Sequence, residues 1–394
     1  MFKAAVGHSI DPDSTGAIEE VLEQCQETLG DDIPQAGIVI AAIDFEHAEV
    51  LTRIQQTYPG IVLVGGTSVG EMSSAMAFQE DSLMVMLFCS DEVTFTAGLG
   101  RSVSQDATAA TEQALAQATR LQAPAGIKLC YTLAEGLGVD GVALAQGLQN
   151  GLNAATGHNV PIFGGLTADD WQLTRTYQFF GNEVLRDSVV VLTFSGNLIV
   201  SCGVATGQQP IGRKGIVTQS AGNTIYKIDD EPATTFYTNY FGEDKLDFMG
   251  GSSAAMALAV FEDQNHNFYV RSKSGEGDTA GSLTFFGHVP EQATVQFTDC
   301  DDDSILQAAK EAFDKANTAY GGSQPNTALM VSCASRMKKL GTRVKKEYSL
   351  AKNFLGAEMP SMGFYSFGEI SPFSQQTKAH FHNETFTALL LGTE

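Results

Sequence analysis

Hydrophobic positions along the chain fall into two alternating patterns. Short, nearly continuous apolar runs, such as Ile38 to Ile43 and Leu83 to Phe88, predict strands. Elsewhere apolar residues recur at helical spacing, as Ile18, Val21 and Leu22 do, which predicts amphipathic helices. Because strands and helices alternate, we expect an α/β protein with layered mixed sheets.

The alternation repeats three times, and a short corner after a strand marks each repeat. Each corner begins with glycine, has Ser or Thr at its fourth position and an acidic residue at its seventh. The corners are Gly65 to Glu71, Gly164 to Asp170 and Gly363 to Glu369. They align without a gap, so we expect Glu71, Asp170 and Glu369 at equivalent places in the fold.

The elements around the corners extend the repeat to three units, 1–92, 93–196 and 291–394. Each unit is expected to run strand–helix–strand–helix–strand–strand, and the third to begin with the strand Val295 to Thr298. Residues 197–290 break this rhythm with short β-like pieces, which predicts a β-rich insert before the third unit. The chain then divides into domains 1–196 and 197–394.

Composition narrows the class of partner. The chain has 23 Lys and Arg against 46 Asp and Glu, a net charge of −23. This charge argues against nucleic acid and against anionic membrane surfaces, since both would repel the protein. No apolar run is long enough to span a bilayer. Six scattered cysteines without a Cys-x-x-Cys pair indicate reduced thiols and a cytoplasmic location.

The first corner also contains a catalytic pattern. Gly66 to Gly70 matches Gly-x-Ser-x-Gly, in which Ser68 would be a nucleophile with a His base such as His382. However, Thr167 and Ser366 stand at the equivalent positions, and each is followed three residues later by an acid. A recurring hydroxyl and acid favour a turn or capping box over one reaction. A serine hydrolase is therefore the alternative function, and the main prediction is no enzyme.

Two further motifs have structural interpretations. Gly136 to Gly141 matches a dinucleotide-binding fingerprint, but the next strand does not end in an acid, so loop glycines are favoured. Asp299 to Asp303 does not fit a calcium loop, because positions six and twelve are Ser304 and Lys310. These acids are expected to cap a helix.

Several short motifs resemble the FIST family of sensory domains. They are spread over nearly the whole chain: Gly66–Glu71, Pro161–Gly165, Pro210–Gly212, Gly287–Pro290, Gly363–Glu369 and Phe381–Thr385. The resemblance implies one N-terminal and one C-terminal FIST domain. It implies cytoplasmic sensing of small ligands, amino acids among those proposed, in signal transduction. It also implies a separate output protein, such as a histidine kinase or a diguanylate cyclase.

A subset of stand-alone FIST proteins binds haem and senses nitric oxide, and the resemblance extends the prediction to haem. Haem iron needs an axial side chain such as His. His382 ranks first because it lies in a matched motif, and His288 ranks second.

The ligand site is expected in the loops at the strand ends. Glycine lets a ligand approach the backbone, and exposed N–H groups can hold anionic atoms. The candidate residues are Gly65, Gly66, Ser68, Glu71, Gly164, Gly165, Asp170, Gly363, Tyr365, Glu369, His382 and Asn383.

Overall fold

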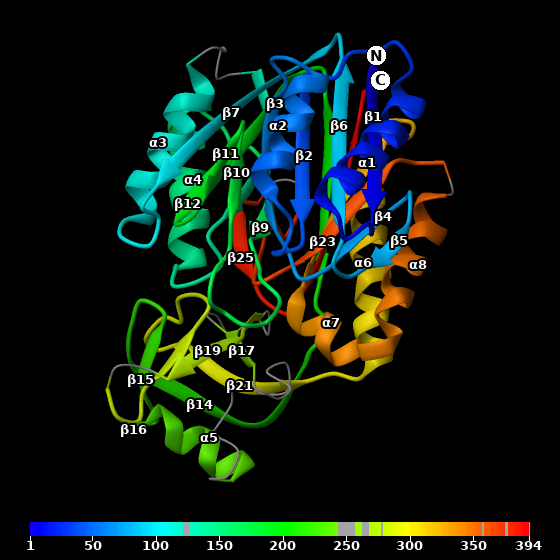
Figure 1. The fold of residues 1–394 in the computed structure, drawn as a ribbon. Helices are drawn as coiled ribbons and strands as arrows, with labels where there is room; N and C mark the ends of the chain where they lie inside the picture. Colours follow the sequence, from blue (N-terminus) through cyan, green and yellow to red (C-terminus); the bar gives the residue numbers. More distant parts are fainter. Residues whose placement is uncertain are drawn as a thin grey trace.

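The computed structural model describes residues 1–120, 126–242, 257–261, 268–276, 279–356, 358–374 and 377–393. It has a body of three mixed sheets with helices on the outside, and a smaller lobe below the body (Figure 1). This is the α/β class with layered mixed sheets that the sequence predicts.

The three repeats are visible in the order of the strands. The first unit consists of β1 (Phe2–Ser9), α1 (Ser14–Leu29), β2 (Ala36–Ala41), α2 (His47–Thr57), β3 (Val62–Thr67) and β6 (Leu83–Ser90). Its strands pair in the order β1-β6-β2-β3. Only β2 and β3 are parallel, and the other two pairings are antiparallel.

The other two units have the same order. The second consists of β7 (Val93–Arg101), α3 (Ala107–Thr119), β8 (Ile127–Ala134), α4 (Gly141–Thr156), β9 (Ile162–Leu166) and β12 (Ser188–Gly196). The third consists of β13 (Ile199–Ala205), α6 (Asp302–Ala319), β22 (Thr327–Cys333), α7 (Ala334–Leu340), α8 (Val344–Leu355), β23 (Ser361–Ser366) and β26 (Phe386–Gly392). Their strands pair in the orders β7-β12-β8-β9 and β13-β26-β22-β23. The three units therefore share the same strand order.

The expected first strand of the third unit is wrong. Val295 to Thr298 lies in β21 (Thr294–Asp299), which pairs with β14 (Gln209–Ala221) and β17 (Leu258–Phe261) in the lobe. The strand equivalent to β1 and β7 is β13, which pairs with β26. Both candidates are short apolar strands upstream of α6, and only the pairing distinguishes them. The lobe is thus inserted within the third unit, between β13 and α6.

After each corner the chain leaves its own sheet and adds a hairpin to another unit's sheet. Hairpin β4 (Glu71–Ser73)–β5 (Ala77–Gln79) joins β23, β10 (Gln178–Phe180)–β11 (Glu183–Leu185) joins β3, and β24 (Glu369–Pro372)–β25 (Ala379–His382) joins β9. The first unit therefore completes the third sheet, the second completes the first, and the third completes the second. This cyclic exchange holds the body together.

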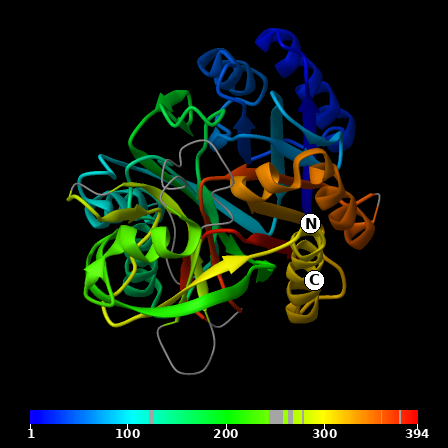
Figure 2. The same ribbon diagram turned by 90° about the horizontal axis from the view of Figure 1, so that it is seen from below.

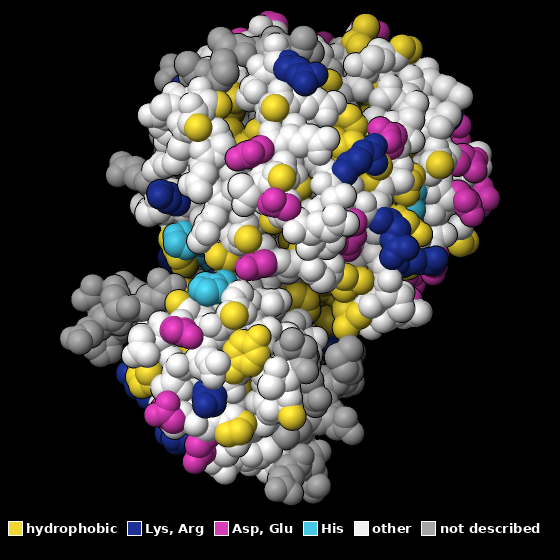
Figure 3. Space-filling view, turned by 90° about the vertical axis from the view of Figure 1, so that its left-hand side faces the viewer, with side chains coloured by type: hydrophobic (Ala, Val, Ile, Leu, Met, Phe, Trp, Pro, Cys, Tyr) yellow, Lys and Arg dark blue, Asp and Glu magenta, His cyan; other side chains and the backbone are white. Residues whose placement is uncertain are grey.

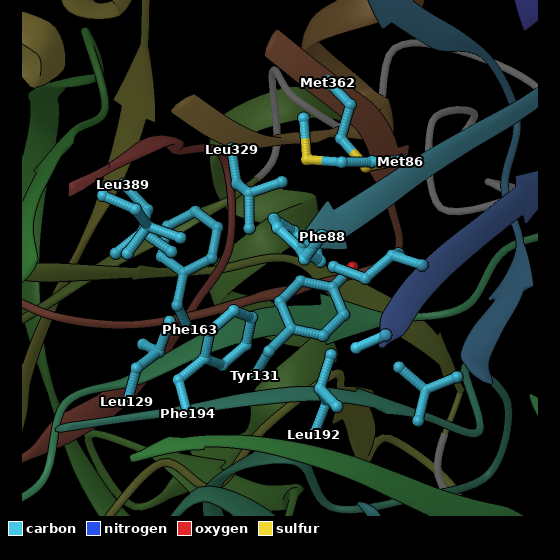
Figure 4. Close-up of a cluster of buried hydrophobic side chains, with 14 of the residues drawn as sticks. Met86, Phe88, Leu129, Tyr131, Phe163, Leu192, Phe194, Leu329, Met362 and Leu389 are labelled. Atoms are coloured by element: carbon cyan, nitrogen blue, oxygen red, sulfur yellow. The ribbon is translucent and has the colours of Figure 1, made fainter. Parts of the chain in front are cut away.

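The strands are buried on both faces, which explains their continuous apolar runs. Alternate residues such as Met86 and Phe88 point into a central core shared by all three sheets (Figure 4). The intervening residues, such as Val85 and Leu87, pack against α1 and α2 on the outer face. Helices α3 and α4 cover the second sheet in the same way, and α6, α7 and α8 cover the third.

The lobe has its own hydrophobic core. Its remaining elements are β15 (Thr224–Ile228), β16 (Glu231–Pro232), α5 (Ala233–Phe241), β18 (Tyr269–Arg271), β19 (Lys273–Glu276) and β20 (Leu283–Phe285). It lies below the second unit, while the two chain termini lie together at the first and third units (Figures 1 and 2). A waist separates it from the body, and hydrophobic side chains are visible at the junction (Figure 3).

Further features concern the helix N-termini, the cysteines and the length of the helices. Asp140 caps α4 and Asp301 caps α6 through backbone N–H groups, as expected of loop and capping residues. All six cysteines are buried and free. Within the described ranges, no helix is long and apolar enough to cross a membrane.

Candidate functional site

Glu71 begins β4 at the first corner and is completely buried. One carboxylate oxygen accepts from the Ser68 hydroxyl and the other from the Ser82 hydroxyl, the latter at 2.5 Å. Burial outweighs these hydrogen bonds and raises the pKa of Glu71 to about 7. The side chain ties the start of the exchanged hairpin to the strands of its own unit.

Glu369 has the same role at the third corner. It begins β24, is completely buried and accepts from the Ser366 hydroxyl at 3.1 Å. Its other oxygen accepts from the Thr385 N–H at 3.2 Å and the Thr385 hydroxyl at 2.7 Å. Burial raises the pKa of Glu369 to about 8. Burial therefore favours the protonated form of the carboxyl.

The second corner departs from the gapless alignment, and the expected equivalence of Asp170 is wrong. Asp170 is exposed in a loop, and Gln178 begins the exchanged strand β10. Gln178 pairs with Gly66, just as Glu369 pairs with the equivalent Gly165. Its amide donates to Thr167 at 2.8 Å and accepts from the Ser188 N–H at 3.1 Å. Gln178 follows Thr167 by eleven residues, whereas Glu71 follows Ser68 by three, so an inserted loop hid the equivalence.

Glycines at the corners allow each corner strand to pack closely against the neighbouring parallel strand. A Cβ on Gly65 would lie 2.1 Å from the Val39 carbonyl oxygen, and one on Gly164 would lie 1.8 Å from that of Thr132. A Cβ on Gly363 would lie 2.6 Å from the Met330 Cβ. Because glycine has no Cβ, the adjacent parallel strand can approach at these three positions. Our expectation that these glycines admit a ligand does not match this geometry.

Ser68 does not lie in a triad geometry in the part of the chain that the structure describes. Its buried hydroxyl contacts the Gly70 carbonyl and the Glu71 carboxylate. His8, which shares Ser82 with Glu71, contacts the hydroxyls of Ser73 and Ser82, each at 2.8 Å. Burial lowers the pKa of His8 to about 4, so its ring is neutral.

A cavity of about 80 Å³ lies where the third corner, the lobe and the long loop of the second unit meet. Its lining comes from these three regions and from the start of α7: Trp171, Leu173, Ser272, Lys273, Ser274, Phe286, Cys333, Ala334, Ser335, Lys338, Ser366, Phe367 and Asn383. It lies at the carboxyl ends of the parallel strands β22 and β23. Such strand ends are the usual ligand position in α/β folds.

Asn383 is the most informative residue of the lining. It is 1% exposed, and its Oδ1 accepts from the Ser272 N–H at 3.3 Å. That contact fixes the orientation of the amide and leaves Nδ2 buried with no partner among the described residues. A buried, unpaired donor is costly unless a ligand or water satisfies it. Across the cavity, the Lys338 ammonium lies 5.0 Å from the centre of the Trp171 ring.

Glu384 lies behind this lining and distinguishes the third unit from the other two. It is buried with a φ of +60°, and its equivalents Asp81 and Asp187 also have positive φ, at 51° and 49°. Neither Asp is buried. One Glu384 oxygen accepts from the Ser272 hydroxyl at 2.8 Å, and the other is 3.4 Å from the Gln208 amide nitrogen. Burial raises the pKa of Glu384.

The structure brings together only part of the predicted site. Asn383 lines the cavity, and so does Ser366 of the third corner, while Glu369 lies behind Ser366. Tyr365 is buried with its hydroxyl on Glu347 at 2.6 Å. The remaining candidates lie outside the lining: Gly65, Gly66, Ser68, Glu71, Gly164, Gly165, Asp170, Gly363 and His382.

Sequence analysis missed the lobe residues, Lys338 and the apolar walls of the cavity. One available signal was Trp171, the single tryptophan of the chain.

The two histidines ranked highest as haem ligands do not line this cavity. His382 is buried with Nε2 on the Ser371 carbonyl oxygen at 2.8 Å, and burial lowers its pKa to about 3. His288 Nδ1 lies 2.7 Å from the Gly222 carbonyl oxygen. Neither residue lines the cavity, whose volume is well below the roughly 300–1,000 Å³ of drug-sized ligand sites. No cluster of potential metal ligands occurs in the described ranges.

Family comparisons agree with this arrangement. Residues 35–231 match the family model of the FIST N domain, and residues 233–372 match that of the FIST C domain. The chain belongs to the FIST family. FIST domains are sensory domains that bind small ligands in signal transduction. The two FIST matches meet inside the lobe, so the lobe carries residues of both.

Other similarities are more limited. An 84-residue stretch of this FIST chain is 30% identical to an uncharacterized protein of Methanocaldococcus jannaschii. The match covers 21% of the chain and 16% of that relative. Among solved structures, a cyanuric acid hydrolase from A. caulinodans is similar over 100% of this chain and 99% of its own, with 10% identity and a TM-score of 0.39. A second cyanuric acid hydrolase structure covers 100% of both chains, with 9% identity and a TM-score of 0.34. Scores this low carry no argument about function.

Proposed function

We propose that this FIST protein is a cytoplasmic sensor, not an enzyme, and that the cavity at the third corner is its ligand site. The observation that carries the proposal is the buried, unpartnered Nδ2 of Asn383 in the cavity lining. A ligand with a hydrogen-bond acceptor would satisfy this group. The small volume favours a ligand of few heavy atoms.

The position of the cavity supports a sensory role because both lobe and body line it. The lobe is already joined to the body here, since Ser272 donates to Asn383 and the Arg271 guanidinium donates to the Phe381 carbonyl at 3.1 Å. A ligand would add contacts on both sides and stabilise one arrangement of the lobe. Differential contacts of this kind are what a ligand needs to shift a conformational equilibrium. We propose that a separate protein, such as a histidine kinase or a diguanylate cyclase, binds this conformation and transmits the signal.

The contacts of Ser68 support its structural role over hydrolysis. Its hydroxyl is buried and donates to Glu71, as the equivalent Ser366 donates to Glu369. At the second corner the equivalent Thr167 accepts from the Gln178 amide. A hydroxyl hydrogen-bonded to the first residue of the exchanged strand thus recurs at all three corners, whereas a nucleophile would be needed only once. Ser68→Ala should therefore leave ligand binding intact.

The direct test is a thermal-shift panel of small acids, amides and amines on the full chain. A ligand at about 100 times its Kd should stabilise the protein by about 2.7 kcal/mol. Trp171→Ala should abolish the shift, because it removes a wall of the cavity. Phe373→Ala is the matched control, since Phe373 is an exposed aromatic outside the cavity. An equal loss of the shift in both variants, or a flat panel with the wild type, would contradict the proposed site.

A further inference from the structure

Two buried carboxyls lie directly behind the cavity, and a cavity-lining serine contacts each. Ser366 is within hydrogen-bond distance of Glu369, and Ser272 of Glu384. Both carboxyls are essentially unexposed. Neither forms an ion pair with Lys or Arg in the described part of the chain. One extra proton on either group therefore changes the hydrogen bonds of the lining.

The direction of that change follows from the single hydrogen of each serine hydroxyl. When Glu384 is ionised, Ser272 must donate to it and presents only lone pairs to the cavity. When Glu384 is protonated, its O–H can donate to Ser272, and the Ser272 hydrogen is released toward the cavity. Ser366 differs, because its hydroxyl also lies 3.1 Å from the Gly368 carbonyl oxygen, which can accept its hydrogen when Glu369 is protonated. Protonation of Glu384 thus adds one donor to the unpaired Asn383 amide and the Lys338 ammonium, and protonation of Glu369 removes a negative charge from behind the lining.

We propose that the cavity binds a small carboxylate anion together with a proton held by the Glu369–Glu384 pair. This inference rests on the proposed ligand site and names its ligand class. With the pair protonated, the lining offers hydroxyl, amide and ammonium donors to the anion. With the pair ionised, the same hydroxyls turn their lone pairs to the cavity and two negative charges repel the ligand.

The surroundings of the pair are compatible with proton uptake. The titratable and charged groups that face it are Cys333 at the end of β22, Arg336 and Lys339 of α7, and Glu347 of α8. Arg336 is held by Glu347 at 2.6 Å, and Lys339 by Asp299 at 3.2 Å. These cations are already paired, so burial dominates and the pKa values of both carboxyls are raised.

The test is titration calorimetry of the full chain with acetate and propionate, and with acetamide and ethylamine as neutral and cationic probes. Measurements in two buffers of different ionisation enthalpy count the protons that accompany binding. The expected result, above the pKa of the pair where the free protein has lost the proton, is proton uptake with the carboxylates and a Kd that increases about tenfold per pH unit. Proton release, or no proton exchange, with a bound carboxylate would overturn the inference.

Variants localise the effect. Glutamine mimics a protonated carboxyl, so Glu369→Gln/Glu384→Gln should bind carboxylates without proton uptake. Glu71→Gln is the matched control, because Glu71 is an equivalent buried carboxyl outside the cavity, and it should keep the wild-type uptake. Uptake that persists in the double variant would refute the assignment to this pair. If only acetamide or ethylamine binds, the proposed ligand class is wrong but the proposed ligand site is not contradicted. If no probe binds, both the ligand class and the ligand site are contradicted.

Discussion

The first and third corners have the same buried acid and hydroxyl, but the cavity described above lies beside the third. Glu71 and Glu369 each receive two hydroxyls, which shows that this arrangement belongs to the repeat. The differences lie around it. The third unit has buried Glu384 where the others have less buried Asp81 and Asp187, and only the third unit carries the inserted lobe. Features that the repeats share therefore have a structural role, and the candidate site lies where the third unit differs from the other two.

The largest expected effect is at a feature that the corners share. Gly164→Ala would place a Cβ 1.8 Å from the Thr132 carbonyl oxygen at a φ of +151°. We expect a loss of about 4 kcal/mol or more in the free energy of unfolding, or failure to fold. Gly181→Ala is the control, because Gly181 also has positive φ but no atom lies within 4 Å of its Cβ position. It should cost about 1–2 kcal/mol by urea denaturation. Equal losses would show that the close approach of the strands is unimportant.

A second prediction compares the two buried acids through pH. The pKa of Glu369 is raised to about 8 from an ordinary value of 4.5, so between these values the folded state binds a proton that the unfolded state has lost. The free energy of unfolding should therefore decrease as pH rises from 4.5 through about 8, by a few kcal/mol. Glu369→Gln should remove this contribution, and Glu71→Gln a smaller one that ends near pH 7. Urea denaturation at pH 5.5 and 8.5 measures both. Unchanged pH dependence in both variants would contradict it.

The second corner offers the reciprocal experiment. Gln178→Glu places a carboxyl where the amide donates to Thr167, so the new group must stay protonated to keep that hydrogen bond. We expect a loss of about 1–3 kcal/mol at pH 8.5 and a smaller loss at pH 5.5. A loss that is equal at both pH values would mean that the corner does not discriminate an amide from a carboxylate.

The smallest expected effect concerns the positive φ positions before the last strand of each unit. Asp81→Gly should change the free energy of unfolding by no more than about 1 kcal/mol, because glycine adopts this conformation without strain. Glu384→Gly relieves the same backbone strain at positive φ but also removes a buried carboxyl. It should therefore alter carboxylate binding. If Asp81→Gly altered binding equally, the contrast between the units would fail.

The sequence alone was sufficient to predict the three repeats. Strands buried on both faces leave continuous apolar runs, and the corners share a glycine, a hydroxyl and an acid. The sequence was insufficient where pairing is decided by distant segments. β13 and Val295–Thr298 look alike, and only contact with β26 identifies the first strand. The long loop after Thr167 concealed Gln178, and the cavity is made by segments that meet only in the folded chain. Asn383 was found through its motif, whereas Lys338 carries no pattern that points to a shared site.

The exchange of hairpins also governs the order in which the protein can be completed on the ribosome. The hairpin Glu71–Gln79 is translated long before its partner strand Ser361–Ser366. The hairpin of the first unit therefore has no partner strand until β23 of the third unit has been translated. The first and third units thus depend on each other, and a truncation before Ser361 would leave this hairpin without its partner strand.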